Sequence, residues 1–199
     1  MKIRWAFLAL FFLSGCAAVP STPDVMGNLV EANPVPLAAV KLRSDAPLLG
    51  MQPVKGELGP GAPAVKLAQG SSYYRLYRLP QVNGTLHLKL ISYCACLGFD
   101  KRIAVPVVRV LTKAGQVIEP LPDGYEYSVE SAHGFTPLSV TLDVTVPSPN
   151  ATYALVASDN SRPDASVERI NIVGIGGSLM RLNVRAYPAG HFDIRYAGP

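Results

Sequence analysis

Four stretches of this chain alternate between apolar and polar residues in a way that no helix can satisfy. In the first, Leu86, Leu88 and Leu90 alternate with polar neighbours, and the others cover residues 138–146, 180–186 and 192–196. Successive side chains of a β-strand point to opposite faces, so each stretch predicts a strand with one buried face. Strands that each bury a single apolar stripe need a second layer to cover that stripe.

Turn signals separate these strands and two further apolar ones. Stretches rich in Gly, Pro and Asn lie at 83–84, 113–115, 122–124, 148–150 and 188–190. The runs 103–111, which contains Pro106, and 153–157 predict strands that are apolar at nearly every position. Strands and turns that recur every 8–12 residues or so are typical of sandwiches and barrels. We therefore predict an all-β domain over residues 65–199, an antiparallel, jelly-roll-like β-sandwich.

The first fifteen residues predict an export signal. Lys2 and Arg4 precede a short apolar run that ends at Leu13-Ser14-Gly15-Cys16, and this order is typical of a secretory leader. The stretch resembles a bacterial lipobox, which implies cleavage after residue 15 and acylation, as with palmitate, of Cys16. The alternative is a transmembrane helix, but the run falls short of the ~20 apolar residues that a bilayer requires. Ala17 follows the cysteine, and the resemblance then implies a periplasmic protein anchored to the outer membrane.

Residues 16–64 are punctuated by prolines and end in a cluster of glycines. Proline fixes φ and removes a backbone donor, so we expect no regular helix in this segment. The segment is interpreted as an extended tether between the lipidated cysteine and the sandwich. Apolar residues such as Leu37, Val40 and Leu49 suggest that its second half lies against the domain.

The charge of the chain argues against a nucleic-acid partner. Of its 18 basic residues, Lys2 and Arg4 belong to the leader, so 16 remain against 14 acidic residues. No dense cluster of Lys and Arg occurs along the sequence, and such a cluster is the usual sign of nucleic-acid binding. The partners that we expect are the membrane, through the lipid on Cys16, and an oligosaccharide or another envelope protein.

The sequence contains no motif that predicts catalysis. It lacks the Gly-x-Ser-x-Gly of hydrolases, the His-Glu-x-x-His of zinc proteases and a phosphate-binding loop. His87 and His191 fall on polar faces of predicted strands, and His133 lies in a predicted turn. We therefore expect a protein that is not an enzyme and that has no cofactor and no metal site.

The tyrosines are the candidate contacts for a ligand or partner. Tyr73 and Tyr77 cluster in one predicted strand, and Tyr125 and Tyr127 in another. Tyrosine offers a flat apolar face and a polar tip, which suit both sugars and protein partners. The alternative is that the rings pack within the fold, because aromatic residues are common in strands in any case.

Cys94 and Cys96 leave three interpretations open. They could remain as buried or reduced thiols, form a local disulfide, or supply half of a metal site. In a straight strand their separation is near the upper limit for a relaxed disulfide, so a bridge would need a bent backbone. Buried or reduced thiols are the leading interpretation, although an oxidising periplasm disfavours free thiols.

Several strand motifs together resemble the maltose-operon periplasmic protein family. Residues 84–88 match a G-x-L-x-L strand, residues 106–111 a P-x-V-x-x-L strand, and residues 188–194 a final P-x-G-x-x-x-I strand. The resemblance covers about residues 68–196. It implies an exported β-sandwich with a link to maltose or maltodextrin uptake, and it supplies no catalytic residues. The lipobox and the Cys94-Ala95-Cys96 stretch depart from the family pattern.

These observations favour a non-enzymatic, lipid-anchored periplasmic protein that is accessory to carbohydrate transport. The competing function is that of a structural lipoprotein, which tethers a secretion or envelope complex to the outer membrane. Binding of maltodextrin would favour the first, and association with an inner-membrane assembly would favour the second.

Overall fold

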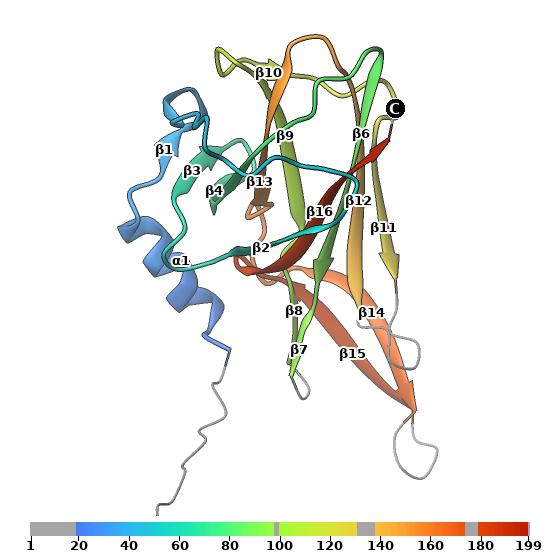
Figure 1. The fold of residues 1–199 in the computed structure, drawn as a ribbon. Coiled ribbons are helices and arrows are strands. Elements are labelled where there is room, and N and C mark those ends of the chain that lie inside the picture. Colours follow the sequence, from blue (N-terminus) through green and yellow to red (C-terminus); the bar gives the residue numbers. More distant parts are fainter. Residues whose placement is uncertain (1–18, 98–99, 131–137, 174–178, 199) are drawn as a thin grey trace, which may run out of the picture.

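The computed structural model of the chain describes residues 19–97, 100–130, 138–173 and 179–198 (Figure 1). Strands make up most of these residues. The helical part of the described chain consists of α1 (Thr22–Glu31) and one 3₁₀ turn, η1 (Leu37–Ala39). The all-β class predicted from the alternating stretches is therefore confirmed.

The largest sheet has five antiparallel strands. Their order is β11 (Tyr125–Glu130), β12 (Ser139–Pro147), β6 (Thr85–Tyr93), β16 (Gly190–Gly198) and β2 (Val54–Leu58). Three of the four alternating stretches form its central strands. The register places Leu142 of β12 opposite Leu90 of β6, and Leu90 opposite Ile194 of β16. The alternation therefore gives this sheet one continuous apolar face, as residues that pair directly across strands share a face.

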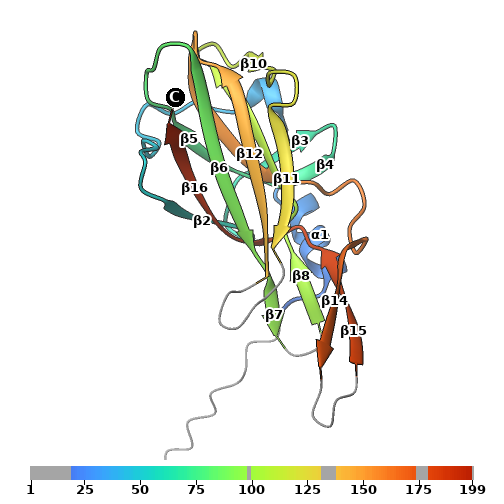
Figure 2. The ribbon, with the colours of Figure 1, turned by 90° about the vertical axis from the view of Figure 1, so that its right-hand side faces the viewer.

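A second antiparallel sheet faces this one across the main core (Figure 2). Its order is β10 (Val117–Ile118), β9 (Pro106–Thr112), β13 (Ala151–Ser158) and β5 (Arg75–Arg78). Pro106 begins β9, a position where a missing backbone donor interrupts no existing ladder.

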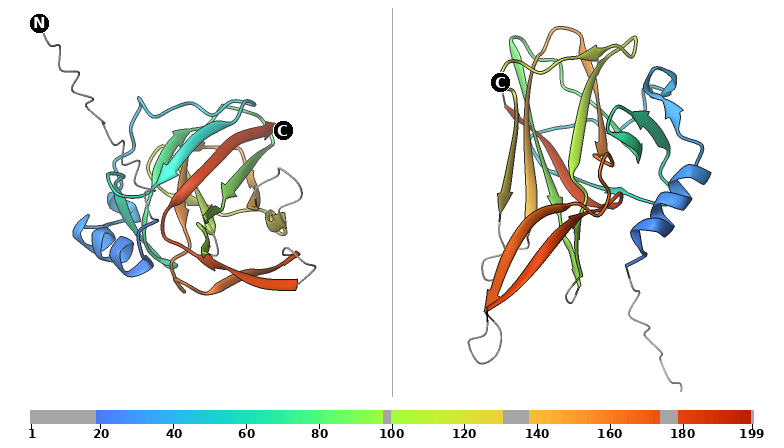
Figure 3. Two further views of the ribbon diagram at one scale, coloured as in Figure 1. Left: turned by 90° about the horizontal axis from the view of Figure 1, so that it is seen from below. Right: turned by 180° about the vertical axis from the view of Figure 1, so that it is seen from behind.

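Two further sheets complete the described part of the fold. One contains β1 (Val35–Pro36), β3 (Ala64–Leu67) and β4 (Gly70–Tyr73), and the other contains β14 (Ser166–Val173), β15 (Leu179–Ala186), β8 (Asp100–Ile103) and β7 (Ala95–Leu97). The pairs β1–β3 and β8–β15 are parallel. Figure 3 shows the four sheets from below and from behind. The buried residues of the described chain form three separate hydrophobic clusters.

The jelly-roll-like sandwich of two antiparallel sheets is not clearly what forms. Four small sheets are arranged in a ring, and two of them contain a parallel pair. The chain leaves the five-stranded sheet after Tyr93 and enters a different sheet at Ala95. An alternating pattern predicts that a strand exists and which face it buries, but it does not specify the strand's neighbours.

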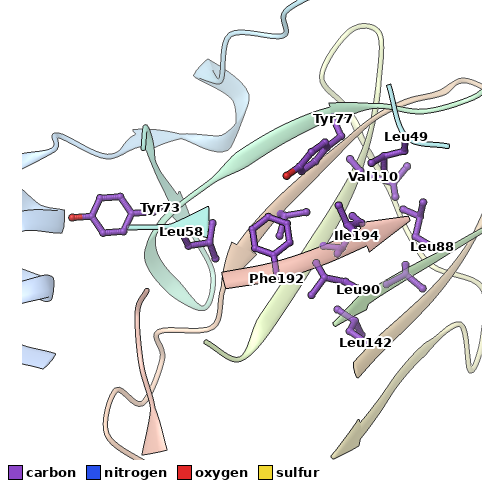
Figure 4. Packing of buried hydrophobic residues seen from close by; sticks show 14 of the residues in the cluster. Leu49, Leu58, Tyr73, Tyr77, Leu88, Leu90, Val110, Leu142, Phe192 and Ile194 are labelled. Atoms are coloured by element: carbon purple, nitrogen blue, oxygen red, sulfur yellow. The ribbon is translucent and has the colours of Figure 1, made fainter. Parts of the chain in front are cut away.

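The main core lies between the five-stranded sheet and the sheet of β10, β9, β13 and β5 (Figure 4). Leu88 and Leu90 of β6, Leu142 of β12 and Ile194 of β16 are at most 1% exposed, and Val110 of β9 faces them from the opposite sheet. Burial of each such side chain contributes about 1.5–3 kcal/mol, before entropy is subtracted. This packing removes the apolar faces of the alternating strands from water, and that burial stabilises the fold.

Residues 19–64, the described part of the segment expected to be a tether, are folded onto the body. Our expectation that residues 16–64 exclude a regular helix is wrong, because α1 spans Thr22–Glu31. Pro23 lies in the first turn, where a missing backbone donor breaks no helical hydrogen bond, and the side chain of Ser21 caps the helix by accepting from the Asp24 amide. Val25 and Leu29 of this helix are buried in the main core. Residues of this segment, β2 included, are therefore part of the packed domain.

Candidate functional site

Two of the candidate tyrosines are packed inside the fold. Tyr73 is 1% exposed, and Tyr77 is 3% exposed. The Tyr77 ring meets the Phe192 ring edge-on, with centroids 6.3 Å apart (Figure 4). Burial raises the pKa of Tyr77 to about 12, so this phenol stays protonated under ordinary conditions. Neither ring offers a flat face on which a ligand could stack.

The other two candidate tyrosines connect the sheets. Both lie on the inner face of β11, opposite Val144 and Leu142 of β12. The Tyr127 hydroxyl donates to the Pro106 carbonyl (2.5 Å), and the Tyr125 hydroxyl accepts from the Val108 amide (3.3 Å). These partners belong to the start of β9, which β10 does not reach. The two phenols therefore satisfy backbone groups on an edge of the facing sheet.

The pKa of Tyr127 is raised by burial of its hydroxyl and by the neighbouring Tyr125. The two rings pack at 72° with centroids 5.4 Å apart. This geometry favours the packing interpretation for Tyr125 and Tyr127.

Cys94 and Cys96 are joined by a disulfide, with Cα atoms 5.1 Å apart. The bend that such a bridge requires lies between the end of β6 at Tyr93 and the start of β7 at Ala95. Both cysteines pack against a small cluster that contains Ile103 and Val140. Across the described ranges, no group of three or more His, Cys, Asp and Glu residues is placed to hold a metal ion.

Cys16 and the rest of the predicted leader lie outside the described residues. No helix of the described chain is both long enough and apolar enough to span a bilayer.

A cleft of about 590 Å³ lies where β2 approaches β5. Three segments line it. They are residues 41–47, residues 54–57 of β2, and residues 74–77, which comprise Tyr74 and the first three residues of β5. Pro63 and His191 complete the lining. Its volume falls in the range typical of small-ligand sites, ~300–1,000 Å³.

Glycine at position 56 permits the close approach that forms the floor of the cleft. Gly56 lies directly opposite Phe192 in the β2–β16 register. A Cβ atom at this position would be 2.2 Å from Cζ of Phe192 and 2.5 Å from the Tyr77 hydroxyl oxygen. The absence of a side chain therefore lets both aromatic rings pack beneath β2.

Hydrogen bonds to backbone carbonyl groups hold the walls of the cleft in place. Nε of Arg75 donates to the Glu57 carbonyl (2.8 Å) and ties β5 to β2. Nε of Arg78 donates to the Ala46 carbonyl (2.9 Å), and the Arg78 amide donates to the Pro47 carbonyl (2.8 Å). The segment 41–47 is thus attached to β5 next to the cleft.

The lining is rich in positive charge. It contains Lys41, Arg43, Lys55 and Arg75 against only Asp45 and Glu57. Arg43 forms a two-pronged contact with Asp45 (2.9 and 2.5 Å), which lowers the pKa of that carboxyl and raises that of Arg43. Nδ1 of His191 lies 3.9 Å from the Glu57 carboxylate.

The cationic groups of Lys41, Lys55 and Arg75 are available to contact a ligand. Within the described parts of the chain, Lys41 and Lys55 have no salt bridge, and Arg75 makes the single bond to the Glu57 carbonyl. The two terminal nitrogens of the Arg75 guanidinium can therefore face an acceptor.

Of the residues of this cleft, the sequence suggests a ligand contact only at the tyrosines of the 73–77 cluster, of which Tyr74 and Tyr77 line the cleft. The cationic residues come from segments that are far apart in the chain, so no cluster is visible along the sequence. Residues 41–57 were also assigned to the tether, which removed Lys41 and Lys55 from consideration. The Tyr77 hydroxyl has no hydrogen-bond partner among the described residues, and the residue lines the cleft.

Comparison with known proteins does not place the chain in a family. No protein-family model matches it, and neither a curated protein nor a solved structure does.

Proposed function

We propose that this chain is a non-enzymatic, lipid-anchored periplasmic protein that binds a saccharide as an accessory to carbohydrate uptake. The observation that carries the proposal is the cleft between β2 and β5. Its lining combines the apolar side chains of Val54 and Leu76 with several hydrogen-bond donors, a combination typical of sites for small polar ligands. The lipid on Cys16 and the carbohydrate link come from the sequence resemblances.

The docked N-terminal segment limits how far the body can lie from a membrane anchor. The Pro20 carbonyl accepts hydrogen bonds from Tyr187 (2.8 Å) and Arg102 (2.5 Å), and the Thr22 hydroxyl donates to Asp164 (2.6 Å). Only three residues, 17–19, lie between position 16 and Pro20, and the four Cα–Cα steps from one to the other span at most about 14 Å. A lipid on Cys16 would therefore hold the folded body close to the outer membrane.

The proposal is tested by titrating the full-length lipoprotein, purified in detergent, against a panel of neutral and acidic oligosaccharides that includes maltodextrins. We expect saturable binding to at least one saccharide, and a loss of affinity of about tenfold or more when Arg75→Ala removes a hydrogen-bond donor from the lining. Lys66→Ala, on β3 outside the cleft, is the control. A flat response to the whole panel would contradict saccharide binding.

The anchor is tested separately. Metabolic labelling with a palmitate analogue should mark the natural chain and miss Cys16→Ala. Equal labelling of both proteins would remove the lipid from the proposal and leave the cleft unaffected.

A second candidate function is favoured by a different feature. Strand β11 is an outer strand of the five-stranded sheet and is exposed along most of its length. An outer strand with free backbone groups can accept a strand from another protein. This arrangement suits a structural lipoprotein that tethers a secretion or envelope complex. A photoreactive group at Glu126 should then crosslink to an inner-membrane assembly in cells, and the absence of any protein crosslink would argue against this function.

A further inference from the structure

We infer that the cleft between β2 and β5 selects an acidic saccharide, one that carries a carboxylate or phosphate group, over a neutral one. The inference rests on the proposed function, since it names the ligand class of the same site. It departs from the maltodextrin that the sequence resemblance implies, because maltodextrins carry no charge.

The charge balance of the lining supports an anion. The residues that line the cleft include four Lys or Arg side chains and two carboxylates. One carboxylate, that of Asp45, is engaged by Arg43, and both of these side chains are about two-thirds exposed. The other carboxylate, that of Glu57, lies 3.9 Å from His191 and leaves one negative charge against Lys41, Lys55 and Arg75, so the net charge of the lining is positive. Clefts lined by one sign of charge concentrate ligands of the opposite sign.

Arg75 has the geometry to recognise the acidic group itself. Its guanidinium is held at one nitrogen by the Glu57 carbonyl, 2.8 Å away. A guanidinium oriented in this way presents its two remaining nitrogens as a fork, and such a fork matches the two oxygens of a carboxylate or phosphate. Lys55 on β2 adds a second positive charge to the lining of the same cleft.

The saccharide part of the ligand would meet the floor and rim. Tyr77 presents a hydroxyl that has no partner among the described residues, and burial keeps this group protonated. A protonated phenol can both donate to and accept from a sugar hydroxyl. Val54 and Pro63 supply apolar contact beside it. The site therefore combines recognition of an anion with contacts suited to a sugar ring.

The test is calorimetric titration of the full-length lipoprotein in detergent with four probes. Trigalacturonate and glucose 6-phosphate carry the two kinds of acidic group, maltotriose matches the first in length without charge, and inorganic phosphate lacks the sugar. We expect at least one acidic saccharide to bind about tenfold or more tightly than both maltotriose and inorganic phosphate. Tighter binding of trigalacturonate would identify a carboxylate as the preferred acidic group, and tighter binding of glucose 6-phosphate would identify a phosphate. Added salt should weaken the binding of the acidic saccharide and leave the affinity for maltotriose unchanged.

Charge reversal at Lys55 provides the matched variant. Lys55→Glu should reduce affinity for the acidic saccharide to the level of maltotriose, whereas Lys66→Glu, an exposed lysine on β3 outside the cleft, should not change it. Arg75→Lys keeps the charge but loses the fork, so we expect an intermediate loss.

The outcomes separate the inference from the proposed function. Maltotriose binding as tightly as the acidic saccharides would overturn the inference and leave saccharide binding intact. Inorganic phosphate binding as tightly as either acidic saccharide would reduce the cleft to a simple anion site and overturn the saccharide class. An unchanged affinity in Lys55→Glu would also overturn the inference. If no saccharide of either kind binds, both proposals fail.

Discussion

The two outer edges of the five-stranded sheet meet the facing sheet in opposite ways. At the β11 edge, Tyr125 and Tyr127 reach across and bond to the backbone of β9. At the β2 edge, Gly56 lets two aromatic rings pack beneath the strand, and a cleft lined with cationic side chains opens beside β5. One edge thus satisfies its neighbour's polar groups internally, while the other keeps donors available. The β11 edge of the sheet therefore stabilises the fold, whereas the β2 edge is available to bind a ligand.

The largest expected effect comes from adding an atom at the β2 edge. Gly56→Ala places a Cβ atom 2.2 Å from Cζ of Phe192 and 2.5 Å from the Tyr77 oxygen, and both rings are buried. We expect the free energy of unfolding to fall by about 3 kcal/mol, as in other overpacked cores. Urea denaturation measures the loss.

Gly59→Ala is the matched control for this change. A Cβ atom at position 59 has no neighbour closer than Ala189 Cβ at 3.8 Å, so its effect should stay within about 0.5 kcal/mol. Equal losses in the two variants would show that the close packing under β2 is not special.

The next largest effect is an alkaline loss of stability that depends on Tyr77. Its pKa is about 12 in the fold and 10 in the reference state, so the fold favours the neutral phenol. This contribution is fully present below pH 10 and is lost as the pH rises through 12. It amounts to about 2 kcal/mol at most, since each pKa unit is worth 1.36 kcal/mol and part of the shift is screened.

Tyr77→Phe isolates this contribution. The variant should match the natural protein near pH 8 and fall less steeply between pH 10 and pH 12 when urea midpoints are compared. Parallel curves for the two proteins across that window would mean that the phenol is solvated, contrary to the packing described.

At the β11 edge we expect a smaller effect. Tyr127→Phe removes the hydrogen bond to the Pro106 carbonyl, and the ring is 43% exposed. The expected loss in the free energy of unfolding is about 1 kcal/mol, the usual net value of one hydrogen bond. Tyr196→Phe, whose hydroxyl makes no hydrogen bond within the described residues, serves as the comparison. If Tyr127→Phe is neutral, the phenols do not join the sheets.

The strands could be predicted from the sequence, but the pairing of one strand with another could not. Leu86, Leu88 and Leu90 reveal a strand because the period of two is a local signal. Pairing depends on distant residues, so the parallel contact of β8 with β15 and the division into four sheets could not be read from the pattern. Helix α1 forms despite the prolines, because Pro23 lies in its first turn and Ser21 caps it. The stretch Ser21-Thr22-Pro23-Asp24 contains a capping residue with an acidic residue three positions later, which is a recognised helix start.

The candidate site was almost invisible in the sequence. Lys41, Lys55 and Arg75 are separated by 14 and 20 residues, and only folding brings them to one cleft. Tyr77 was singled out for its aromatic face, but the structure presents its hydroxyl instead. Tyr125 and Tyr127 were singled out by the same argument and are engaged with β9.

The difference between the two edges is tested most directly by mapping backbone amide shifts while the protein is titrated with an acidic trisaccharide. We expect saturable shifts at the amides of Lys55, Gly56 and Arg75 and none along residues 125–130. Shifts that gather on β11 while the amides of β2 and β5 stay fixed would contradict it.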